Sequence, residues 1–291
     1  MKNSSVLIVG CGDIGIRTGG LLMGRGWRVA GVRRDISKLP AEFVGYAADY
    51  TEAASLDFIA QLKPDFVIAT FNPAGRTPEG YKAGFQMAMS HLISGLGPHR
   101  PQHILMASST RVFAEASGGW VDECSPLVDD DDCAVAIIAA EQQLLASEHN
   151  ASVVRFAGIY GIAGGRLLAR IRSGELCHSE PIRYTNRIHR DDCAGFLAHL
   201  LQLVDAGARI KPLYIGVDDE PAPRHEVEAW LAGEMGVQAT PSDRLLAAVS
   251  LPAGRGTDGH KRCRNKALHN SAYQLIYPNY KSGYSALLDP N

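Results

Sequence analysis

The chain has 291 residues, of which 46% are hydrophobic and 21% are charged, and its formal net charge is −2 at pH 7. This composition is typical of a globular protein that is long enough for one large domain and a smaller one. Because this net charge is near neutral, it gives no electrostatic reason to expect binding to nucleic acid or to an anionic membrane surface.

The N-terminus, MKNSSVLIVGCG, passes from a short apolar run directly into a glycine turn. This run is too short for a signal peptide or a membrane span, so we expect a cytoplasmic protein. The cysteines are scattered along the chain without a C-x-x-C pair, at Cys11, Cys124, Cys133, Cys177, Cys193 and Cys263. This spacing argues against a structural zinc site or a disulfide framework and favours a reducing compartment.

Strand-like and helix-like segments alternate from the N-terminus onwards. Short β-branched runs, several of which end in glycine or serine, predict strands, at residues 5–10, 27–34, 65–71, 103–109, 152–161 and 213–219. Amphipathic or apolar stretches between them predict helices, at residues 14–26, 79–97 and 133–149. Such alternation indicates β-α-β units and a doubly wound parallel sheet of the α/β class, covered by helices on both faces.

Two parts of the chain fit this rhythm poorly, residues 161–186 and residues 218–291. We expect them to form a smaller, C-terminal substrate lobe. The main domain then consists of residues 1–160 and 187–217.

A glycine-rich turn, Gly10-x-Gly12-x-x-Gly15, follows the first expected strand and opens the first expected helix, with Asp13 and Ile14 at its second and third variable positions. The first glycine permits the tight turn, the second allows close approach of a pyrophosphate, and the third allows close packing of helix and strand. The helix N-terminus supplies free N–H groups for the phosphates. In this context the turn predicts a dinucleotide site, whereas a role in packing alone is the alternative.

The end of the second expected strand predicts which dinucleotide binds. An NAD site has an acidic residue about 20 residues past the glycines, to bond the ribose 2′-hydroxyl. Here Arg33 and Arg34 occupy that place, and Asp35 follows in the next loop. Two guanidinium groups suit a 2′-phosphate, so we favour NADP as the cofactor, with NAD possible. The alternative is a basic loop on a solvated surface.

These segments together resemble the extended short-chain dehydrogenases/reductases, specifically the NAD-dependent epimerase/dehydratase family. Asp49 and Tyr50, in YAADY, stand where the family's aspartate meets the adenine. ATFNPAG, which contains Thr70, stands where the family has its turn beside the nicotinamide ribose. The resemblance implies an NAD(P)-binding Rossmann fold and a cofactor site at these residues.

The resemblance continues to the end of the chain. MASSTRVFAEASGGWVDECSP resembles the family's Ser-Ser-x-x-Val-Tyr-Gly segment, VVRFAGIYG its sixth strand, and NRIHRDDCAGFLAHLL its His-x-Asp-Asp helix start. The segments LYIGVDDEPAPRHEVEAWLA and KRCRNKALHNSAYQLIYPNYKSGYSALL resemble the family's C-terminal lobe, including Lys261 and Asn265. The extended enzymes usually have G-x-x-G-x-x-G at the glycine turn, whereas this chain has G-x-G-x-x-G. This difference indicates an atypical member of the family.

In this family a tyrosine serves as general acid/base, and a lysine four residues later lowers its pKa and holds the ribose. Alignment on Glu141 puts Cys133 at the tyrosine position and Ile137 at the lysine position. The chain therefore lacks the usual pair on this helix. A Tyr-x-x-x-Lys does occur from Tyr277 to Lys281, but Pro278 makes a helix improbable there, and we interpret it as chance.

Several other side chains are candidates for the chemistry. The resemblance implies that Ser109, with Thr110 beside it, bonds the reacting oxygen; a hydroxyl that caps the strand end is the alternative. Tyr160, expected near the nicotinamide, and Tyr184 are candidate phenols for a rearranged site. Arg187 is a candidate contact for an anionic group of the substrate. We interpret Cys133 as core packing rather than a reactive thiol.

Acidic residues near the helix starts have a structural interpretation. The run Asp129–Asp132 predicts a solvated loop that caps the following helix, because consecutive side chains diverge and cannot converge on a metal. We expect no metal site. The resemblance implies that His189 is mainly structural, and Asp191 and Asp192 are typical of a helix start.

Two functions follow from these patterns. The first is an NADP-dependent oxidoreductase or epimerase/dehydratase-like enzyme with a small, sugar-like substrate. The alternative is a non-catalytic NADP-binding sensor or partner-binding protein, favoured by the missing pair. The expected helices at 79–96 and 133–149 are those that many relatives pack into a homodimer, so the resemblance makes a homodimer possible.

Overall fold

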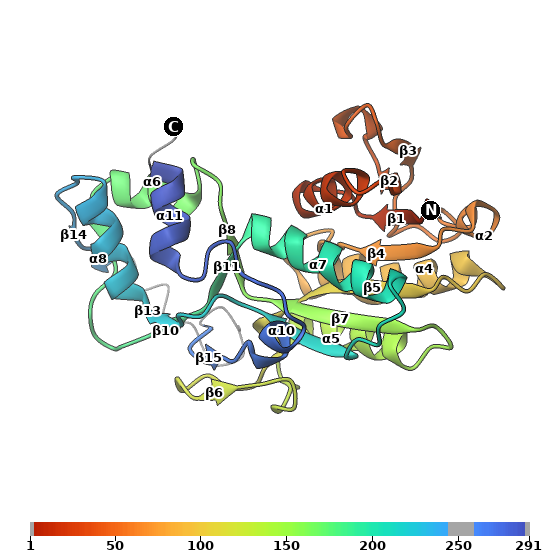
Figure 1. Ribbon diagram of the computed structural model, residues 1–291. Coiled ribbons are helices and arrows are strands. Elements are labelled where there is room, and N and C mark those ends of the chain that lie inside the picture. Colours follow the sequence, from red (N-terminus) through yellow and green to blue (C-terminus); the bar gives the residue numbers. More distant parts are fainter. Residues whose placement is uncertain (1–2, 244–258, 289–291) are drawn as a thin grey trace.

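The computed structural model describes residues 3–243 and 259–288, and its centre is a seven-stranded sheet whose strands are all parallel (Figure 1). The strand order is β12-β7-β5-β4-β1-β2-β3, which confirms the expected doubly wound sheet. The strands are β1 (Ser5–Val9), β2 (Arg28–Arg33), β3 (Val44–Ala47), β4 (Phe66–Ala69), β5 (His103–Ser109), β7 (Ala151–Phe156) and β12 (Leu213–Gly216).

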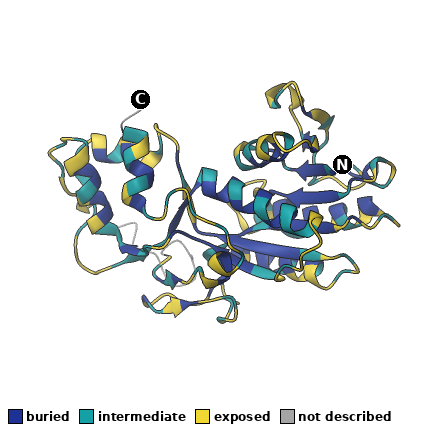
Figure 2. Ribbon diagram, viewed as in Figure 1, coloured by how far each residue is buried: buried dark blue, intermediate teal, exposed yellow. Residues whose placement is uncertain are grey.

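Helices cover both faces of the sheet because successive strand residues point to opposite sides. In β1, Leu7 and Val9 belong to one hydrophobic cluster, whereas Val6 and Ile8 belong to the other. Figure 2 shows these strands buried between the helical layers. The first cluster includes residues of α2 (Ile59–Leu62), α4 (Ala88–Leu96) and α5 (Asp132–Leu145); the second includes residues of α1 (Asp13–Met23), α7 (Arg190–Asp205) and α10 (Lys266–Asn270).

Two expected elements are each divided in the structure. The expected helix at 79–97 consists of α3 (Pro78–Tyr81), a π-helical turn (Lys82–Met87) and α4. The expected strand at 152–161 ends at Phe156, where its partners β5 and β12 also end. The chain then continues as β8 (Gly158–Tyr160), which pairs with β11 (Arg187–His189). Pairing partners distant in sequence decide where the strand ends.

A third hydrophobic cluster lies outside the sheet, at the left of Figure 1. It joins α6 (Arg166–Arg172), α8 (Arg224–Glu234) and α11 (Tyr280–Leu288). Short strands frame it, in the pairs β9 (Glu175–Leu176) with β14 (Thr240–Pro241) and β10 (Tyr184–Thr185) with β13 (Ala222–Pro223).

The expected lobe at 161–186 and 218–291 contains these helices, but it also contains α10, whose Ala267 and Leu268 pack with the sheet. Nearby, β15 (Arg262–Cys263) pairs with β6 (Trp120–Val121) of the main domain. The division into two domains therefore stays a proposal. Residues 244–258 and 289–291 of the expected lobe lie outside the described residues.

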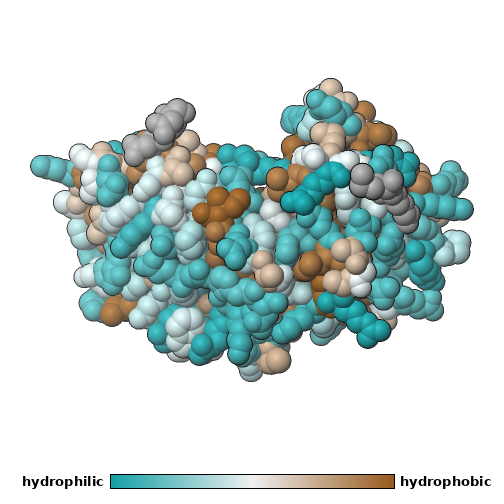
Figure 3. Space-filling view, viewed as in Figure 1, coloured by the Kyte–Doolittle hydropathy of each residue, from teal (hydrophilic) through white to brown (hydrophobic). Residues whose placement is uncertain are grey.

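The molecular surface seen in Figure 3 is mostly hydrophilic, with separate hydrophobic patches. In the described ranges 3–243 and 259–288, no helix combines the length and the apolar character needed to cross a membrane.

A buried ion pair holds α5 against the sheet. Arg155, on β7, donates from Nη2 to a carboxylate oxygen of Glu141 at 2.6 Å, and the two side chains are 5% and 2% exposed. Ser108, on β5, donates its hydroxyl to the same carboxylate. The Arg155 guanidinium also lies 5.0 Å from the ring centre of Phe113. The glutamate in this otherwise apolar helix therefore fixes where the helix lies over β5 and β7.

We expect Glu141→Gln to lower the free energy of unfolding by about 3 kcal/mol or more, because Arg155 keeps its charge in a buried place without a full counter-charge. The matched control is Glu148→Gln, which breaks an exposed pair with Arg100 and is expected to cost less than about 1 kcal/mol. Urea unfolding of both variants measures the difference, and equal losses would contradict the structural role of Glu141.

Candidate functional site

The glycine turn lies where the order of the strands reverses. From β1 the chain continues to β2 and β3 on one side, and β4 is added on the other side of β1. Such a switch point leaves a crevice at the carboxyl ends of the strands, where ligands of open α/β sheets bind. At this edge the Thr70 backbone N–H donates to the Val9 carbonyl oxygen at 2.9 Å.

The three glycines of the turn have different structural requirements. Gly10 has a φ of +79°, and a Cβ there would lie 2.6 Å from the Thr70 carbonyl oxygen. A Cβ at Gly15 would lie 2.9 Å from a methyl carbon of Ile8, on β1. A Cβ at Gly12 would meet no atom nearer than 3.7 Å, the Gly10 carbonyl oxygen. The fold thus requires glycine at positions 10 and 15, and leaves the space at position 12 open.

Gly12 is also the N-cap of α1, and no side chain forms a capping hydrogen bond there. Asp13, in the first turn of the helix, does not cap it. Its carboxylate instead pairs with Arg17 at 3.2 Å and with Arg190 at 3.6 Å. The backbone N–H groups at this helix end are therefore a suitable place for an anion.

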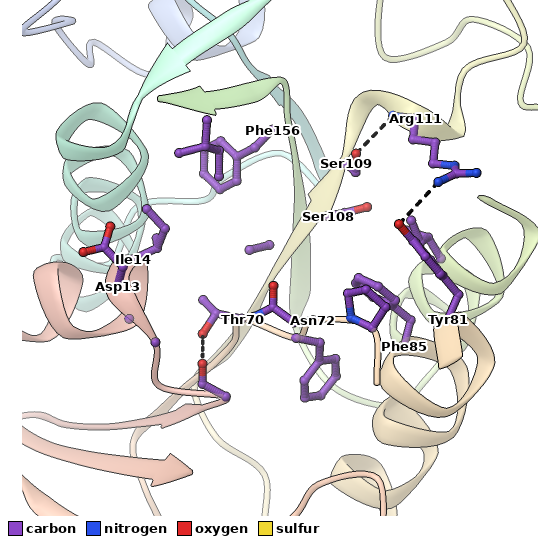
Figure 4. Close-up of a pocket in the computed structure, with 18 of the residues that line it drawn as sticks. Asp13, Ile14, Thr70, Asn72, Tyr81, Phe85, Ser108, Ser109, Arg111 and Phe156 are labelled. Atoms are coloured by element: carbon purple, nitrogen blue, oxygen red, sulfur yellow. Dashed lines mark hydrogen bonds between the residues drawn. The ribbon is translucent and has the colours of Figure 1, made fainter. Parts of the chain in front are cut away.

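Two adjoining cavities follow this edge of the sheet, with volumes of about 420 Å³ and about 290 Å³. Both are lined by Gly10, Gly12, Asn72 and Pro73. The larger one is shown in Figure 4, and its other lining residues include Asp13, Ile14, Gly15, Thr70, Tyr81, Phe85, Ser109, Arg111, Ile137 and Phe156. The site residues expected after β1, β4 and β5 therefore meet in one continuous space.

The smaller cavity is rich in cations. It is lined by Arg33, Arg34 and Lys38, of which only the two arginines were expected from the sequence. Arg33 donates from Nη1 to the Cys11 carbonyl oxygen at 3.2 Å, whereas the Arg34 side chain is 83% exposed and lies 3.6 Å from Asp49. A turn of 3₁₀ helix, Ile36–Lys38, brings the lysine to the cavity.

The carboxylates of this cavity are already engaged. Asp35 caps the 3₁₀ turn by accepting from the Ser37 N–H and hydroxyl, at 3.2 and 2.6 Å. The Ser37 hydroxyl, despite slight desolvation, lowers the pKa of Asp35. Asp49 accepts in the same way from Thr51, at 3.0 and 2.7 Å. Tyr50 lines the cavity beside Asp49, and its hydroxyl donates to the Asn72 carbonyl oxygen at 3.3 Å.

Ser109 ends β5 and lines the larger cavity. Its Oγ accepts from the Arg111 N–H at 3.2 Å, so it also caps the short 3₁₀ turn that Thr110 begins. Both interpretations of Ser109 are thus compatible with its position. Thr110 is not among the residues that line this cavity.

Sequence reasoning missed Tyr81 and Arg111, which contact each other in the larger cavity (Figure 4). The available signal was the arginine inside Ser-Thr-Arg-Val-Phe, a polar residue directly after the strand-end serine. Nothing in the sequence pairs it with a helix 30 residues earlier.

On α5, Ile137 is 1% exposed and lines the larger cavity, and Cys133 is 9% exposed. Burial raises the pKa of the Cys133 thiol, although the nearby Arg111 opposes this. The burial of Cys133 agrees with the packing role expected for it.

The two candidate phenols lie elsewhere. Tyr160 lines a different cavity, of about 440 Å³, and its ring stacks on Tyr284 at 4.5 Å. Its hydroxyl donates to the Asn279 carbonyl oxygen at 3.4 Å, and burial raises its pKa. The neighbouring Ile159 is the residue of β8 that lines the larger cavity. Strand alternation thus turns Tyr160 away from the expected nicotinamide position.

Tyr184 is likewise distant from the glycine turn in the fold. It pairs with Pro223 in the small β10–β13 sheet, and its ring stacks on His260. The Arg262 guanidinium lies 4.6 Å from the centre of the same ring. These contacts give Tyr184 a packing role between the C-terminal segments.

Arg187 lines the cavity that contains Tyr160 and also an adjoining one of about 350 Å³. It is 7% exposed, its Nη2 donates to the Thr185 hydroxyl, and among the described residues its buried Nη1 has no hydrogen-bond partner. The neighbouring lining residues include Arg166, Arg170 and Arg224. A buried guanidinium with a free N–H group is suited to an anionic ligand.

The residues around the start of α7 are structural, as expected. His189 caps the helix by accepting from the Asp191 N–H at 3.2 Å, and Asp191 pairs with Arg17 of α1 at 2.5 Å. The buried Asp192 accepts from the backbone N–H groups of Ile276 and Tyr277, at 2.7 and 3.0 Å.

Tyr277 therefore belongs to a segment held by Asp192 and precedes α11, which begins at Tyr280. The Tyr277 and Lys281 pair does not share a helix, which agrees with its interpretation as chance.

In the acidic run, Asp131 is the N-cap of α5 and accepts from the Cys133 N–H at 3.1 Å. Within residues 3–243 and 259–288, no group of three His, Cys, Asp or Glu side chains is arranged to hold a metal ion.

No model of a protein family matches the chain, and no curated protein does. Solved structures do match. A protein of Methylobacillus flagellatus, described as an NAD-dependent epimerase/dehydratase, is 32% identical over 99% of this chain and 98% of that chain, with a TM-score of 0.80.

Two further structures show the same fold at lower identity. The human epimerase family protein SDR39U1, solved with NADPH, is 18% identical over 99% of this chain and 100% of that chain, with a TM-score of 0.75. The UDP-glucuronic acid 4-epimerase of Bacillus cereus, solved with UDP-glucuronic acid and NAD, is 17% identical over 98% of each chain, with a TM-score of 0.77. With the match to the M. flagellatus protein, the glycine turn and the seven-stranded sheet, the chain belongs to the NAD-dependent epimerase/dehydratase family.

Proposed function

We propose that the protein is an NADP-preferring oxidoreductase of the epimerase/dehydratase type, located in the cytoplasm, with a small, sugar-like substrate that carries an anionic group. The observation that supports it most is the open space at Gly12. The fold has no need of glycine there, whereas a pyrophosphate that approaches the backbone does. The uncapped N-terminus of α1 beside it fits the same group.

The preference for NADP rests on the cations of the smaller cavity. Arg33, Arg34 and Lys38 line it, and the two carboxylates nearest to them already accept hydrogen bonds from their own turns. A ribose 2′-phosphate would find three positive groups, which suit it better than they suit a 2′-hydroxyl. The human protein of this fold was solved with NADPH, which accords with the proposal.

A bound nicotinamide dinucleotide would supply or accept a hydride. The protein's own residues would bind and orient the substrate. Ser109 is in position to donate a hydrogen bond to a substrate oxygen, and Ile137 and Phe156 give the larger cavity an apolar wall. Arg187 is the candidate for an anionic group of the substrate. The Bacillus cereus enzyme of this fold was solved with UDP-glucuronic acid, a substrate with such groups.

The alternative is a non-catalytic NADP-binding sensor or partner-binding protein. It is favoured by Cys133 and Ile137, which occupy the positions of the family's tyrosine and lysine in the alignment on Glu141. A homodimer through the helices at 79–96 and 133–149 is compatible with either function, and Met87, Val135 and Leu145 of these segments are exposed.

The experiment that tests the proposal is calorimetric titration of the purified protein with NADPH, NADP⁺ and NADH. We expect NADPH and NADP⁺, which carry the ribose 2′-phosphate, to bind more tightly than NADH. Failure of all three to bind would refute both functions, and equal affinity for NADPH and NADH would refute the preference.

The variants Gly12→Ala and Gly15→Ala distinguish a glycine that the ligand requires from a glycine that the fold requires. Gly12 has an extended backbone that alanine can adopt and open space for a Cβ, so Gly12→Ala should keep wild-type stability but lower NADPH affinity at least about ten-fold. Gly15→Ala should lose about 1–3 kcal/mol of stability, because its Cβ would collide with Ile8. Calorimetry and urea unfolding measure the two effects, and wild-type NADPH affinity in Gly12→Ala would refute the pyrophosphate site.

Arg34→Ala tests the 2′-phosphate. We expect NADPH affinity to fall about ten-fold or more, the value of one charge-assisted contact, while NADH affinity stays unchanged. The matched control is Arg28→Ala, which removes an exposed arginine from the start of β2, the strand that Arg34 follows. An unchanged ratio of NADPH to NADH affinity in Arg34→Ala would show that this arginine does not contact the phosphate.

A further inference from the structure

A tyrosine and an arginine from different elements meet beside Ser109 in the larger cavity. Arg111 donates from Nη1 to the Tyr81 hydroxyl oxygen at 3.3 Å, and its guanidinium carbon lies 5.1 Å from the centre of the Tyr81 ring. Figure 4 shows the Tyr81 hydroxyl and the Arg111 guanidinium directed toward each other, on the same side of the cavity as Ser109. A phenol, a cation and a strand-end serine thus share one space.

The guanidinium is held in its orientation by Asp131. This carboxylate, 6% exposed, accepts from Arg111 Nε at 2.7 Å and from Nη2 at 2.9 Å, and it is itself fixed by the Cys133 N–H. The bidentate pair leaves Nη1 for the phenol. Because Nη1 donates, the Tyr81 oxygen is an acceptor in this contact, and its own proton is free for another acceptor in the cavity.

The backbone brings Tyr81 to this place by unusually close packing. Tyr81 is the last residue of α3, directly before the π-helical turn Lys82–Met87. A Cβ at Gly80 would lie 2.6 Å from atoms of Gly75, and one at Gly84 would lie 2.3 Å from the Asn72 carbonyl oxygen. The helix therefore lies directly against the turn after β4, which lines both cavities. π-Helical turns of this kind are frequent at functional sites.

The pair also lies next to the positions of the family's missing residues. Ile137, at the lysine position, lines the same cavity. Burial opposes the charge of Arg111, but the Asp131 hydrogen bond and charge, with smaller contributions from Tyr81 and Cys133, raise its pKa. Arg111 is therefore a permanent cation close both to the Tyr81 phenol and to the tyrosine position at Cys133.

We propose that Tyr81 is the proton donor of this enzyme and that Arg111 is its positioning cation, a pair that takes over the task of the family's tyrosine and lysine. The inference rests on the proposed function. In the reductive direction, a bound reduced dinucleotide would supply a hydride to the carbonyl carbon of the substrate, and the C=O bond would become a C–O single bond. The carbonyl oxygen takes the Tyr81 proton, the tyrosinate is stabilised by Arg111, and water returns the proton.

The first experiment measures NADPH oxidation with an aldehyde panel of 4-nitrobenzaldehyde, D-glyceraldehyde and D-glucuronate. Tyr81→Phe keeps the ring and should lower kcat about 10²–10⁴-fold, with the calorimetric Kd for NADPH unchanged. Arg111→Gln should also lower kcat, and Arg111→Lys, which restores a cation, should recover part of it. The matched control is Tyr46→Phe, since Tyr46 stacks on Phe58 at the outer strand β3 and should keep wild-type kcat.

A second readout does not depend on turnover. Tetranitromethane nitrates accessible phenols, and peptide mass spectrometry locates the product. NADPH at ten times its Kd leaves about one tenth of the protein unliganded. We therefore expect nitration of Tyr81 to fall about ten-fold and nitration of Tyr46 to stay the same. Equal nitration of Tyr81 with and without NADPH would place it outside the reaction space and overturn the proposal.

The outcomes separate the two proposals. Wild-type kcat in Tyr81→Phe, with NADPH bound and the panel reduced, would overturn the role of Tyr81 and leave the oxidoreductase function intact. NADPH binding without reduction of any aldehyde would overturn the proton donor and favour the sensor function. Absence of NADPH binding by the wild-type protein would overturn the proposed function itself.

Discussion

The close approach of β1 and β4 at the switch point is the constraint on which the rest of the site depends. It is possible because Gly10 has no Cβ, which would otherwise lie 2.6 Å from the Thr70 carbonyl oxygen. The Thr70 hydroxyl donates back to the Gly10 carbonyl oxygen at 2.9 Å and holds the two strand ends together. Gly10 also lines both cavities, so this contact lies where the two spaces adjoin.

On helix α5, the residue that fixes the helix to the sheet is not the residue that lines the larger cavity. Its anchor is Glu141, which is buried with Arg155 of β7 and Ser108 of β5. The face toward the cavity has Ile137 instead of a charged group. An apolar residue there needs no hydrogen-bond partner and adds to the first hydrophobic cluster. The position of α5 is therefore independent of whether it takes part in catalysis.

Positive charge is concentrated at two separate places, although the net charge of the chain is only −2. One is the smaller cavity with Arg33, Arg34 and Lys38, and the other surrounds the buried Arg187. Close to Arg187, burial raises the pKa of Asp218 to about 8 even though the guanidinium lowers it. The charges nearest to a site, and not the overall balance, decide which ligands it attracts.

The sequence by itself determined the local features: alternating strands and helices, the glycine turn and the arginines at the end of β2. Each depends on neighbours within a few residues, through hydrophobic periodicity and backbone freedom, so a single chain pattern suffices to predict it. The helix start at Asp191 and Asp192 and the burial of Cys133 were also predicted in this way, whereas the contacts of Asp192 with Ile276 and Tyr277 were not.

Contacts between distant segments were decided only by the tertiary structure. Strand pairing ends β7 at Phe156 and turns Tyr160 away from the cavity where the sequence suggested it. The meeting of Tyr81 with Arg111 depends on a π-helical turn and on glycines that press α3 against the turn after β4. No spacing rule joins residues 30 positions apart on different elements, because their separation is set by packing and not by the period of either element.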